Sequence, residues 1–442
     1  MTAGAGPAVL DRLLAQGFTA AEVYVKRGRS RRFELARGSA HSTSDGSSEA
    51  TLSAEEAGWA VRAGREGASF FFAAAGAPEA LDRWPEPVEN GALSLPGPAA
   101  IHGWTEPPEV AEALVGEDEG LRVLRRLAED LERRLPGASL HAASLEDGAS
   151  DVTVVNHRGV EVAHRGRFAA LRLEAWAPVA GGSATASIVL AERCARRFPM
   201  AALADRLIDL LAVRSRGSVG SPGNAEMVLA PEVAARLLAP VAAAFVDRSR
   251  DDVAALLGER DGRVGSADVS MVDDGRHPRG ALAAPVDGEG VPTGERVLVD
   301  GGRLGTTILP WERSDVAIGC RARAGWRDLP RVAPTHVFVC PREDVSPASL
   351  VEDLAEGYYL LDAGVGGSYD LAAGRFSLPV WGFRIVSGRP LHPLGDARLV
   401  GDPRRLLHAV CGVARDLRFV PLGAMIGAPS LRVRGLTLHG SD

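Results

Sequence analysis

The sequence has 442 residues, of which 46% are hydrophobic and 24% charged, and this composition is typical of globular proteins with a sizeable core. The formal net charge of −7 argues against nucleic acid or an anionic membrane as the main partner, because both require clustered positive charge. A chain of this length predicts two or three domains.

Several kinds of chemistry are excluded by the residues that the chain lacks. Every basic residue except Lys26 is an arginine, so the Gly-Lys-Ser/Thr of a phosphate-binding loop is absent. The four cysteines contain no Cys-x-x-Cys pair and do not predict a disulfide framework. The first residues lack the features of a signal peptide, and no run of about 18 apolar residues is present. We therefore expect a reduced, cytoplasmic protein.

Residues 1–218 predict an N-terminal α/β domain with antiparallel strands and two long helices. Apolar residues at helical spacing predict a short helix around residues 9–14 and long helices over residues 109–137 and 199–215. Alternating patterns predict a hairpin over residues 58–76 and strands over residues 20–28, 30–38, 139–146, 150–166 and 168–178. A Gly/Ser/Pro-rich run at residues 217–224 predicts the domain boundary.

Residues 219–442 predict a β-rich, barrel-like C-terminal domain, which makes the whole chain α+β. A strand at residues 226–231 precedes an apolar helix over residues 231–249, in which Pro240 should kink or divide the helix. Short alternating strands with glycine turns then predominate. One later helix is predicted over residues 402–417, and it would place Cys411 in a helical core position.

Motifs for nucleophilic, nucleotide and metal chemistry are missing from the sequence. No serine has the Gly-x-Ser-x-Gly frame; Ser218 and Ser368 come nearest, and a turn serine is the simpler interpretation. Neither Gly-x-Gly-x-x-Gly nor His-Glu-x-x-His occurs. His336 and Cys340 would share one strand face about 13 Å apart, too far to bind one zinc ion.

One acidic segment between predicted strands allows two interpretations. Asp273, Asp274, His277, Asp287 and Glu289 lie in glycine-rich loops, where carboxylates and a histidine could perform acid–base chemistry. Alternatively, the aspartates form turns and cap backbone amides. We favour the second interpretation.

The same segment carries a resemblance to a known family. Its pattern VDD…PRG…VDGEGVPT…RVLVDGGRLGTTIL, within residues 269–309, resembles the core of the TldD/PmbA family of modulator-of-gyrase proteins. Other stretches agree in order, including MVLAP before the apolar helix, GVGGSYDLAAGRFSLPVWGFRIVSGRPLHPL and GAPSLRVRGLTLHG. The resemblance covers roughly residues 222–440 and is weaker in the N-terminal half, where AAEVYVKRG carries it.

The resemblance implies a function for the family, but this sequence differs from the family at the positions of the zinc motif. Members of the family pair as TldD with TldE (PmbA), and the TldD-like subunit is a zinc peptidase with His-Glu-x-x-x-His on the helix after the first C-terminal strand. In this sequence the corresponding positions are Ala239, Pro240 and Ala244, and the family's further zinc-binding cysteine is also missing. Neither a methyl group nor a proline ring can bind zinc or act as a base. The chain therefore resembles the TldE/PmbA-like subunit, without catalytic or metal residues of its own.

The resemblance thus implies a non-catalytic subunit of a zinc metallopeptidase complex that processes unfolded peptides, such as antitoxins or natural-product precursors. Its partners would be a TldD-like subunit, which carries the zinc, and the peptide. Asp287, Glu289 and Gly290 are the candidate functional loop. Two alternatives remain at this point: an independent hydrolase that uses the acidic cluster, or a peptide-binding protein that forms a homodimer when alone.

Overall fold

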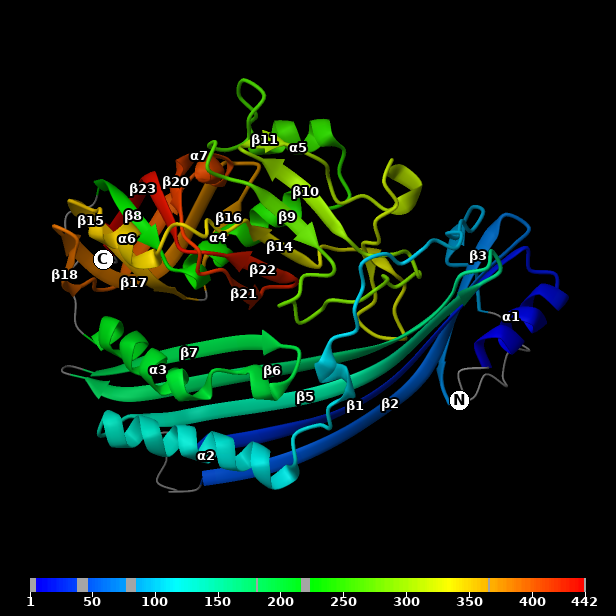
Figure 1. The fold of residues 1–442 in the computed structure, drawn as a ribbon, viewed down its shortest axis with the longest axis horizontal. Helices are drawn as coiled ribbons and strands as arrows, with labels where there is room; N and C mark the ends of the chain where they lie inside the picture. The colour runs from blue at the N-terminus through cyan, green and yellow to red at the C-terminus, as the bar shows by residue number, and fades with distance from the viewer. Residues whose placement is uncertain are drawn as a thin grey trace.

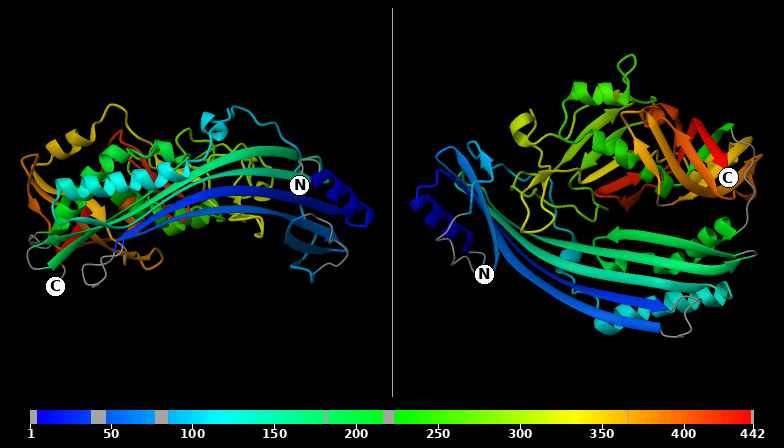
Figure 2. Two further views of the ribbon diagram at one scale, coloured as in Figure 1. Left: turned by 90° about the horizontal axis from the view of Figure 1, so that it is seen from below. Right: turned by 180° about the vertical axis from the view of Figure 1, so that it is seen from behind.

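The computed structural model describes residues 5–37, 47–76, 85–179, 182–215, 223–364 and 366–440. The N-terminal part is built on a seven-stranded antiparallel sheet in the order β4-β3-β2-β1-β5-β6-β7. Its long strands curl along their length, so that the sheet has the form of a half-barrel (Figures 1 and 2). The strands are β1 (Ala20–Arg37), β2 (Ser47–Arg65), β3 (Ala68–Ala75), β4 (Glu89–Asn90), β5 (Ser139–Asn156), β6 (Glu161–Val179) and β7 (Gly182–Glu192).

The hairpins of this sheet match the sequence prediction, but two predicted strands are one. The β2–β3 hairpin turns at Glu66 and Gly67, both with positive φ, and the β5–β6 hairpin turns after Asn156. The separately predicted strands 20–28 and 30–38 form the single strand β1, which pairs without a break along β2. Its continuous pairing with long neighbours on both sides outweighs the local break suggested by Gly28.

Three helices supply the apolar cover of one face of the sheet. Helices α2 (Glu117–Arg134) and α3 (Met200–Ser215) pack on β1, β5, β6 and β7, while α1 (Ala5–Ala15) packs at the opposite end of the strands (Figure 1). Helix α2 begins later than predicted, because Gly116 is extended and Pro108–Ala111 forms a separate short 3₁₀ helix. The predicted helix at residues 199–215 is confirmed as α3, and the predicted short first helix is confirmed as α1, which begins earlier, at Ala5.

The C-terminal part contains a closed ring of five strands in the order β15-β8-β23-β19-β17, with β17 pairing back to β15. This ring confirms the barrel-like prediction and the mixed α+β class. The ring strands and their side strands are β8 (Gly223–Leu229), β15 (Glu356–Ala363), β16 (Ser368–Asp370), β17 (Arg375–Val386), β18 (Arg389–Pro393), β19 (Ala397–Gly401), β20 (Val410–Val413) and β23 (Leu431–Gly440).

A second, six-stranded sheet lies beside the ring in the order β11-β10-β9-β14-β22-β21. Helix α4 (Pro231–Ala244) packs between this sheet and the ring, and its side chains join the largest apolar cluster of the molecule's described residues. The other elements are β9 (Met271–Asp274), β10 (Glu295–Asp300), β11 (Arg303–Leu304), β12 (Arg321–Ala322), β13 (Arg331–Val332), β14 (His336–Val339), β21 (Arg418–Pro421), β22 (Met425–Ala428), α5 (Arg250–Leu257), α6 (Pro347–Glu352) and α7 (Leu406–Ala409).

Two helix predictions in this part are wrong in extent. The helix predicted over residues 402–417 is only α7, after which Val410–Val413 pairs with β23 as strand β20, so Cys411 lies on a strand and is partly exposed. The predicted helix 231–249 ends at Ala244, and Val246 instead bridges to Ile308. The helix runs through Pro240 without being divided.

Two further sequence expectations concern the boundary and membranes. The boundary predicted at residues 217–224 falls largely outside the described residues. Among the residues that the structure describes, no helix is long and apolar enough to cross a membrane.

Candidate functional site

Asp287, the first residue of the predicted functional loop, is a buried backbone cap. Its two carboxylate oxygens accept hydrogen bonds of 2.9–3.0 Å from four backbone N–H groups, those of Glu289, Val291, Cys320 and Arg321. Burial raises the pKa of Asp287, although the four amides oppose that effect. Because both oxygens are engaged, this carboxylate holds two loops together and has no free lone pair directed at a substrate. The capping interpretation of the sequence is confirmed here.

Gly290 brings the same loop against the N-terminal sheet. It has a positive φ of 83°, and a Cβ at this position would lie 2.6 Å from Cγ1 of Val160, beside the β5–β6 turn. Only glycine allows the loop to approach the hairpin this closely. The loop is therefore a contact between the two halves of the chain.

Glu289 is fully buried in the contact that this loop makes. It lies 2.6 Å from Nη2 of Arg62 on β2 and 3.1 Å from Nε of Arg321 on β12, and it accepts a hydrogen bond of 3.2 Å from Nε1 of Trp311. Burial, the largest influence, raises the pKa of Glu289 to about 7, against the lowering effect of Arg62. A carboxylate from the C-terminal half is thus paired with an arginine from the N-terminal sheet.

Arg62 also binds a second buried carboxylate. It forms a two-pronged pair with Glu22 on β1, with N–O distances of 2.6 and 3.0 Å, and Arg323 from the C-terminal half pairs with Glu22 on its other side. Burial alone would raise the pKa of Glu22, but Arg62 and Arg323 outweigh it and lower that pKa. We call Glu22, Arg62, Glu289, Arg321 and Arg323 the domain-joining cluster.

An aromatic contact accompanies this cluster on the same face of the sheet. Trp326 lies over Gly58 on β2, where a Cβ would collide with the indole ring, and it packs in an apolar group with Tyr24 and Val154. The guanidinium of Arg323 lies 4.6 Å from the centre of the Tyr24 ring. Charged and apolar contacts together fix the C-terminal half on this end of the sheet.

The remaining members of the predicted acidic cluster have separate structural partners. Asp273 pairs with Arg296 at 3.1 Å and accepts hydrogen bonds from the backbone at Thr335 and His336. Asp274 caps the backbone N–H of Arg276. His277 accepts a hydrogen bond from the backbone N–H of Arg279, and its ring lies edge-on against the rings of Phe338 and Phe419. The five predicted residues are therefore not assembled into one acid–base site.

Helix α4 carries the positions at which the resemblance places the zinc motif. Ala244 is buried, Ala239 packs partly against the apolar core, and Pro240 is half-buried. The helix sequence PEVAARLLAPVAAA contains no histidine or cysteine, and its acid, Glu232, pairs with Arg206 and Arg418. Within the described ranges no group of three His, Cys, Asp or Glu side chains could hold a metal ion. The side chains at the three motif positions do not fit zinc, because hydrocarbon groups supply no ligand atom.

Pro240 has a specific structural compensation. Its ring nitrogen has no hydrogen to donate to the carbonyl of Arg236 one turn earlier. That carbonyl instead accepts a hydrogen bond of 3.2 Å from Oη of Tyr369 on β16. Burial raises the pKa of Tyr369, so its hydroxyl stays protonated and able to donate. The hydrogen bond from Tyr369 on β16 therefore replaces the helical bond that Pro240 cannot make.

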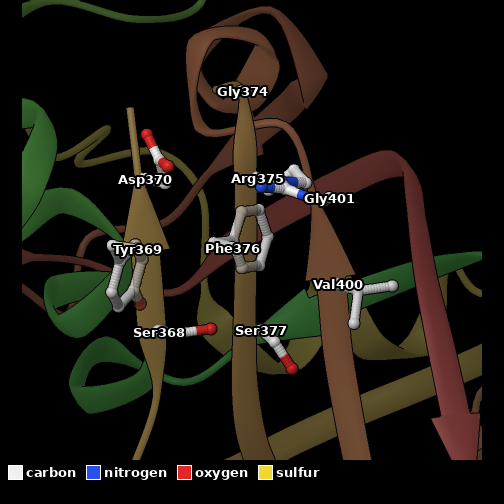
Figure 3. Close-up of a pocket in the computed structure, with 9 residues that line it drawn as sticks. All are labelled: Ser368, Tyr369, Asp370, Gly374, Arg375, Phe376, Ser377, Val400 and Gly401. Carbon is white, nitrogen blue, oxygen red and sulfur yellow. The ribbon is translucent and has the colours of Figure 1, made fainter. Parts of the chain in front are cut away.

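Tyr369 also lines a cavity that sequence reasoning missed. The cavity has a volume of about 680 Å³ and lies between the β16–β17 hairpin and the end of β19 (Figure 3). Tyr369 stacks on Phe376 with ring centres 5.9 Å apart, and Ser368, Asp370 and Arg375 lie around them. Among these residues the sequence pointed only to Ser368, as a turn serine, and Ser368 lies on strand β16 instead. The pairing of residues from three strands gives no local sequence signal.

Comparisons with known proteins give a consistent family relationship. Residues 222–440 match the model of the PmbA/TldA metallopeptidase C-terminal domain. A metalloprotease of Methanocaldococcus jannaschii is 32% identical over 164 residues, which cover 36% of this chain and 35% of that protein. A metalloprotease TldD homolog of Buchnera aphidicola is 23% identical over 199 residues, 40% of each chain. The matches thus span less than half the length of these curated relatives.

Solved structures extend the similarity to the whole fold. The crystal structure of TldE from Thermococcus kodakarensis has a TM-score of 0.83 at 17% identity, and the match covers 99% of this chain and 100% of that one. A protein described as a modulator of DNA gyrase from Thermotoga maritima has a TM-score of 0.77 at 19% identity, with 97% and 99% covered. At these identities the similarity establishes the fold, including that of the N-terminal half.

Proposed function

Because this chain belongs, through residues 222–440, to the PmbA/TldD metallopeptidase family, we propose that it is a TldE-like, non-catalytic subunit. It pairs with a separate TldD-like subunit, which supplies the zinc ion and the catalytic glutamate. Together the two subunits process unfolded peptides. In this arrangement the present chain closes the substrate space and holds extended peptide.

The observation that carries this proposal is the chemistry of helix α4. It follows the first C-terminal strand, where the resemblance places the zinc motif, and it offers Ala239, Pro240 and Ala244 at the motif positions. Zinc requires nitrogen, sulfur or oxygen ligands, and water activation requires a nearby base. None of these three side chains supplies either. The similarity in fold to TldE from Thermococcus kodakarensis agrees with the proposal.

The part of one sheet face that lies beyond the contact with the C-terminal half supports association with a partner. The face of the N-terminal sheet opposite α2 and α3 exposes Leu52, Phe168 and Val189, which are 50%, 37% and 41% exposed. These side chains lie on β2, β6 and β7, so the exposed apolar groups are spread across the sheet. Burial of these apolar side chains against a partner would be favourable, because it removes apolar surface from water. A TldD-like subunit is the occupant we propose, and a second copy of this chain is the outcome that would argue against it.

Strand β16 supports the holding of peptide. Among the described strands it pairs only with β17, so its other edge has unpaired backbone groups, and it borders the cavity of Figure 3. An unpaired edge can add an extended peptide through main-chain hydrogen bonds, which read little sequence. This mode suits a complex that acts on unfolded segments.

The proposal is tested by zinc analysis and by reconstitution. The chain purified alone without chelators should hold less than about a tenth of an equivalent of zinc, since structural zinc sites need about four ligands. Mixed with a TldD-like subunit from the same organism, it should form a heteromeric complex that cleaves an unfolded peptide. The control complex has glutamine in place of the partner's motif glutamate and should bind the peptide without cleaving it.

Three results would contradict the proposal. Near-stoichiometric zinc in the isolated chain would mean that a metal site lies elsewhere on it. Peptide cleavage by the isolated chain would favour an independent hydrolase. A stable homodimer that binds peptide and forms no complex with the TldD-like subunit would favour a stand-alone binding protein.

A further inference from the structure

A second cavity, of about 350 Å³, lies at the end of helix α5, and Arg404 separates it from Gly374 in the lining of the Tyr369 cavity. One wall is formed by the apolar end of α5, and the opposite wall by the segment that joins β19 to α7. Its lining is rich in basic groups: the residues are Ala255, Leu257, Gly258, Arg260, Asp402, Arg404, Arg405 and His408. Three guanidinium groups and one imidazole therefore surround a space with a single carboxylate.

That single carboxylate is already used. Asp402 pairs with Arg404 through both oxygens, at 2.8 to 3.1 Å, and one of these oxygens also accepts from the backbone N–H of Arg404. Neither Arg260 nor Arg405 forms an ion pair within the part of the chain that the structure describes. With His408 neutral, the lining has a net charge of about +2 after the Asp402–Arg404 pair cancels.

The negative charge near the cavity is smaller than the positive charge of its lining. The C-terminal end of α5 contributes about half a negative charge to this region. Two of its last carbonyls, those of Ala255 and Ala254, accept hydrogen bonds from the N–H groups of Gly258 and Glu259. Burial is the largest influence that lowers the pKa of His408. The positive charges of Arg260 and Arg405 lower this pKa further. Nε2 of His408 is buried and has no hydrogen-bond partner in the structure.

We propose that this cavity binds a phosphate-class oxyanion, either inorganic phosphate or a phosphate monoester. A phosphate dianion matches the excess charge of about +2, whereas one carboxylate would neutralise only half of it. Guanidinium groups bind phosphate oxygens through paired, charge-assisted hydrogen bonds. The cavity volume lies at the lower end of the range for small-molecule sites, which leaves room for the organic part of an ester. This site is separate from the proposed peptidase function and does not depend on it.

The proposal is tested by calorimetric titration of the full chain with inorganic phosphate and, separately, with glycerol 3-phosphate, at constant ionic strength. The double variant Arg260→Gln/Arg405→Gln should weaken phosphate binding by at least about tenfold, because it removes two charge-assisted contacts. The matched control is Arg122→Gln/Arg126→Gln, which removes the same charge from exposed positions on α2 and should leave affinity within about twofold.

The two ligands distinguish the sources of the anion. Tighter binding of glycerol 3-phosphate assigns the cavity to a monoester, and equal binding assigns it to the free ion. Absence of saturable binding at millimolar concentration overturns the proposal, as does an equal loss in the α2 control. The variants should fold normally, because Arg260 and Arg405 are exposed, and unfolding scans without ligand check this. A downfield shift of the His408 ring resonances on phosphate addition provides a second readout that does not use a variant.

Discussion

The domain-joining cluster and helix α4 are two buried regions with opposite compositions. The cluster contains two carboxylates and three guanidinium groups, while the buried face of α4 is almost entirely hydrocarbon. Charged residues are the usual constituents of catalytic sites. Here, however, the charges of the cluster are directed at one another across the contact between the two halves of the chain.

This difference shows that the partners of a residue, and not its type, indicate its role. Glu289 has a raised pKa and lies in a loop, two features that favour a catalytic function. Its oxygens nevertheless contact Arg62, Arg321 and Trp311, all of which are structural neighbours. Helix α4 lies where the resemblance places the zinc motif, and its buried side chains pack in the largest apolar cluster of the described residues.

The largest effect should follow the loss of the arginine that both buried carboxylates share. Arg62→Met keeps an unbranched apolar stem but removes the guanidinium, which leaves Glu22 and Glu289 without their common partner. We expect the free energy of unfolding to fall by about 3–5 kcal/mol, the typical cost of breaking a buried ion pair from one side. Denaturation in urea, monitored by tryptophan fluorescence, measures this change.

Arg125→Met is the matched control for this prediction. Arg125 also pairs with a glutamate, Glu49, but the guanidinium is solvent-exposed. Exposed pairs contribute little, so the control should unfold close to the wild type. Similar losses in the two variants would mean that the cluster does not stabilise the contact between the two halves.

A smaller effect should appear in the pH dependence of stability. The pKa of Glu289 is about 7 in the folded chain and near 4.5 when exposed, so the folded state binds the proton more tightly. The resulting stabilisation is complete below about pH 4.5 and is lost as the pH rises through 7. We expect up to roughly 3 kcal/mol of stability to be lost through this group between pH 5 and pH 8.

Glu289→Gln removes this titration and should flatten the curve of unfolding free energy against pH in that window. The difference between wild type and variant is the informative quantity, because buried histidines such as His336, whose pKa is lowered to about 4, contribute with the opposite sign in both proteins. The lowered pKa of Glu22 acts only at lower pH, where stability is lost as the pH falls. Parallel curves for wild type and variant would show that Glu289 does not titrate in this range.

Local patterns predicted those parts of the fold in which near neighbours determine the structure. The β2–β3 and β5–β6 hairpins, helix α3 and the barrel-like ring agree with the sequence analysis. The helix predicted over residues 402–417 was wrong because pairing of Val410–Val413 with β23 outweighed its helical pattern.

Contacts between distant segments explain what the sequence could not predict about the candidate site. Asp287 was interpreted correctly as a cap, since an aspartate in a glycine-rich turn is a local signal. The contact between Glu289 and Arg62 joins residues far apart in the chain, and nothing near either residue indicates it. The cavity beside Tyr369 likewise needs strands that only the tertiary fold brings together.

The smallest predicted loss of stability concerns the hydrogen bond between strand β16 and helix α4. Tyr369→Phe removes the hydroxyl that satisfies the carbonyl of Arg236, which Pro240 leaves without its helical partner. We expect a loss of about 1–2 kcal/mol in the free energy of unfolding, the cost of an unsatisfied buried acceptor. Tyr358→Phe is the control, because no described residue hydrogen-bonds to its hydroxyl, and it should change stability less.

Repeating Tyr369→Phe in a Pro240→Ala background tests the cause of that loss. Alanine restores the backbone N–H, which can donate to the Arg236 carbonyl within the helix. The tyrosine hydroxyl then becomes dispensable, and its removal should cost about 1 kcal/mol less than in the wild type. Equal losses in both backgrounds would show that Tyr369 stabilises the protein through its ring packing on Phe376 alone. A reduced loss would mean that the hydrogen bond from β16 compensates for the proline at position 240. Helix α4 would then be stabilised by a specific contact at the position where the family resemblance places a catalytic glutamate.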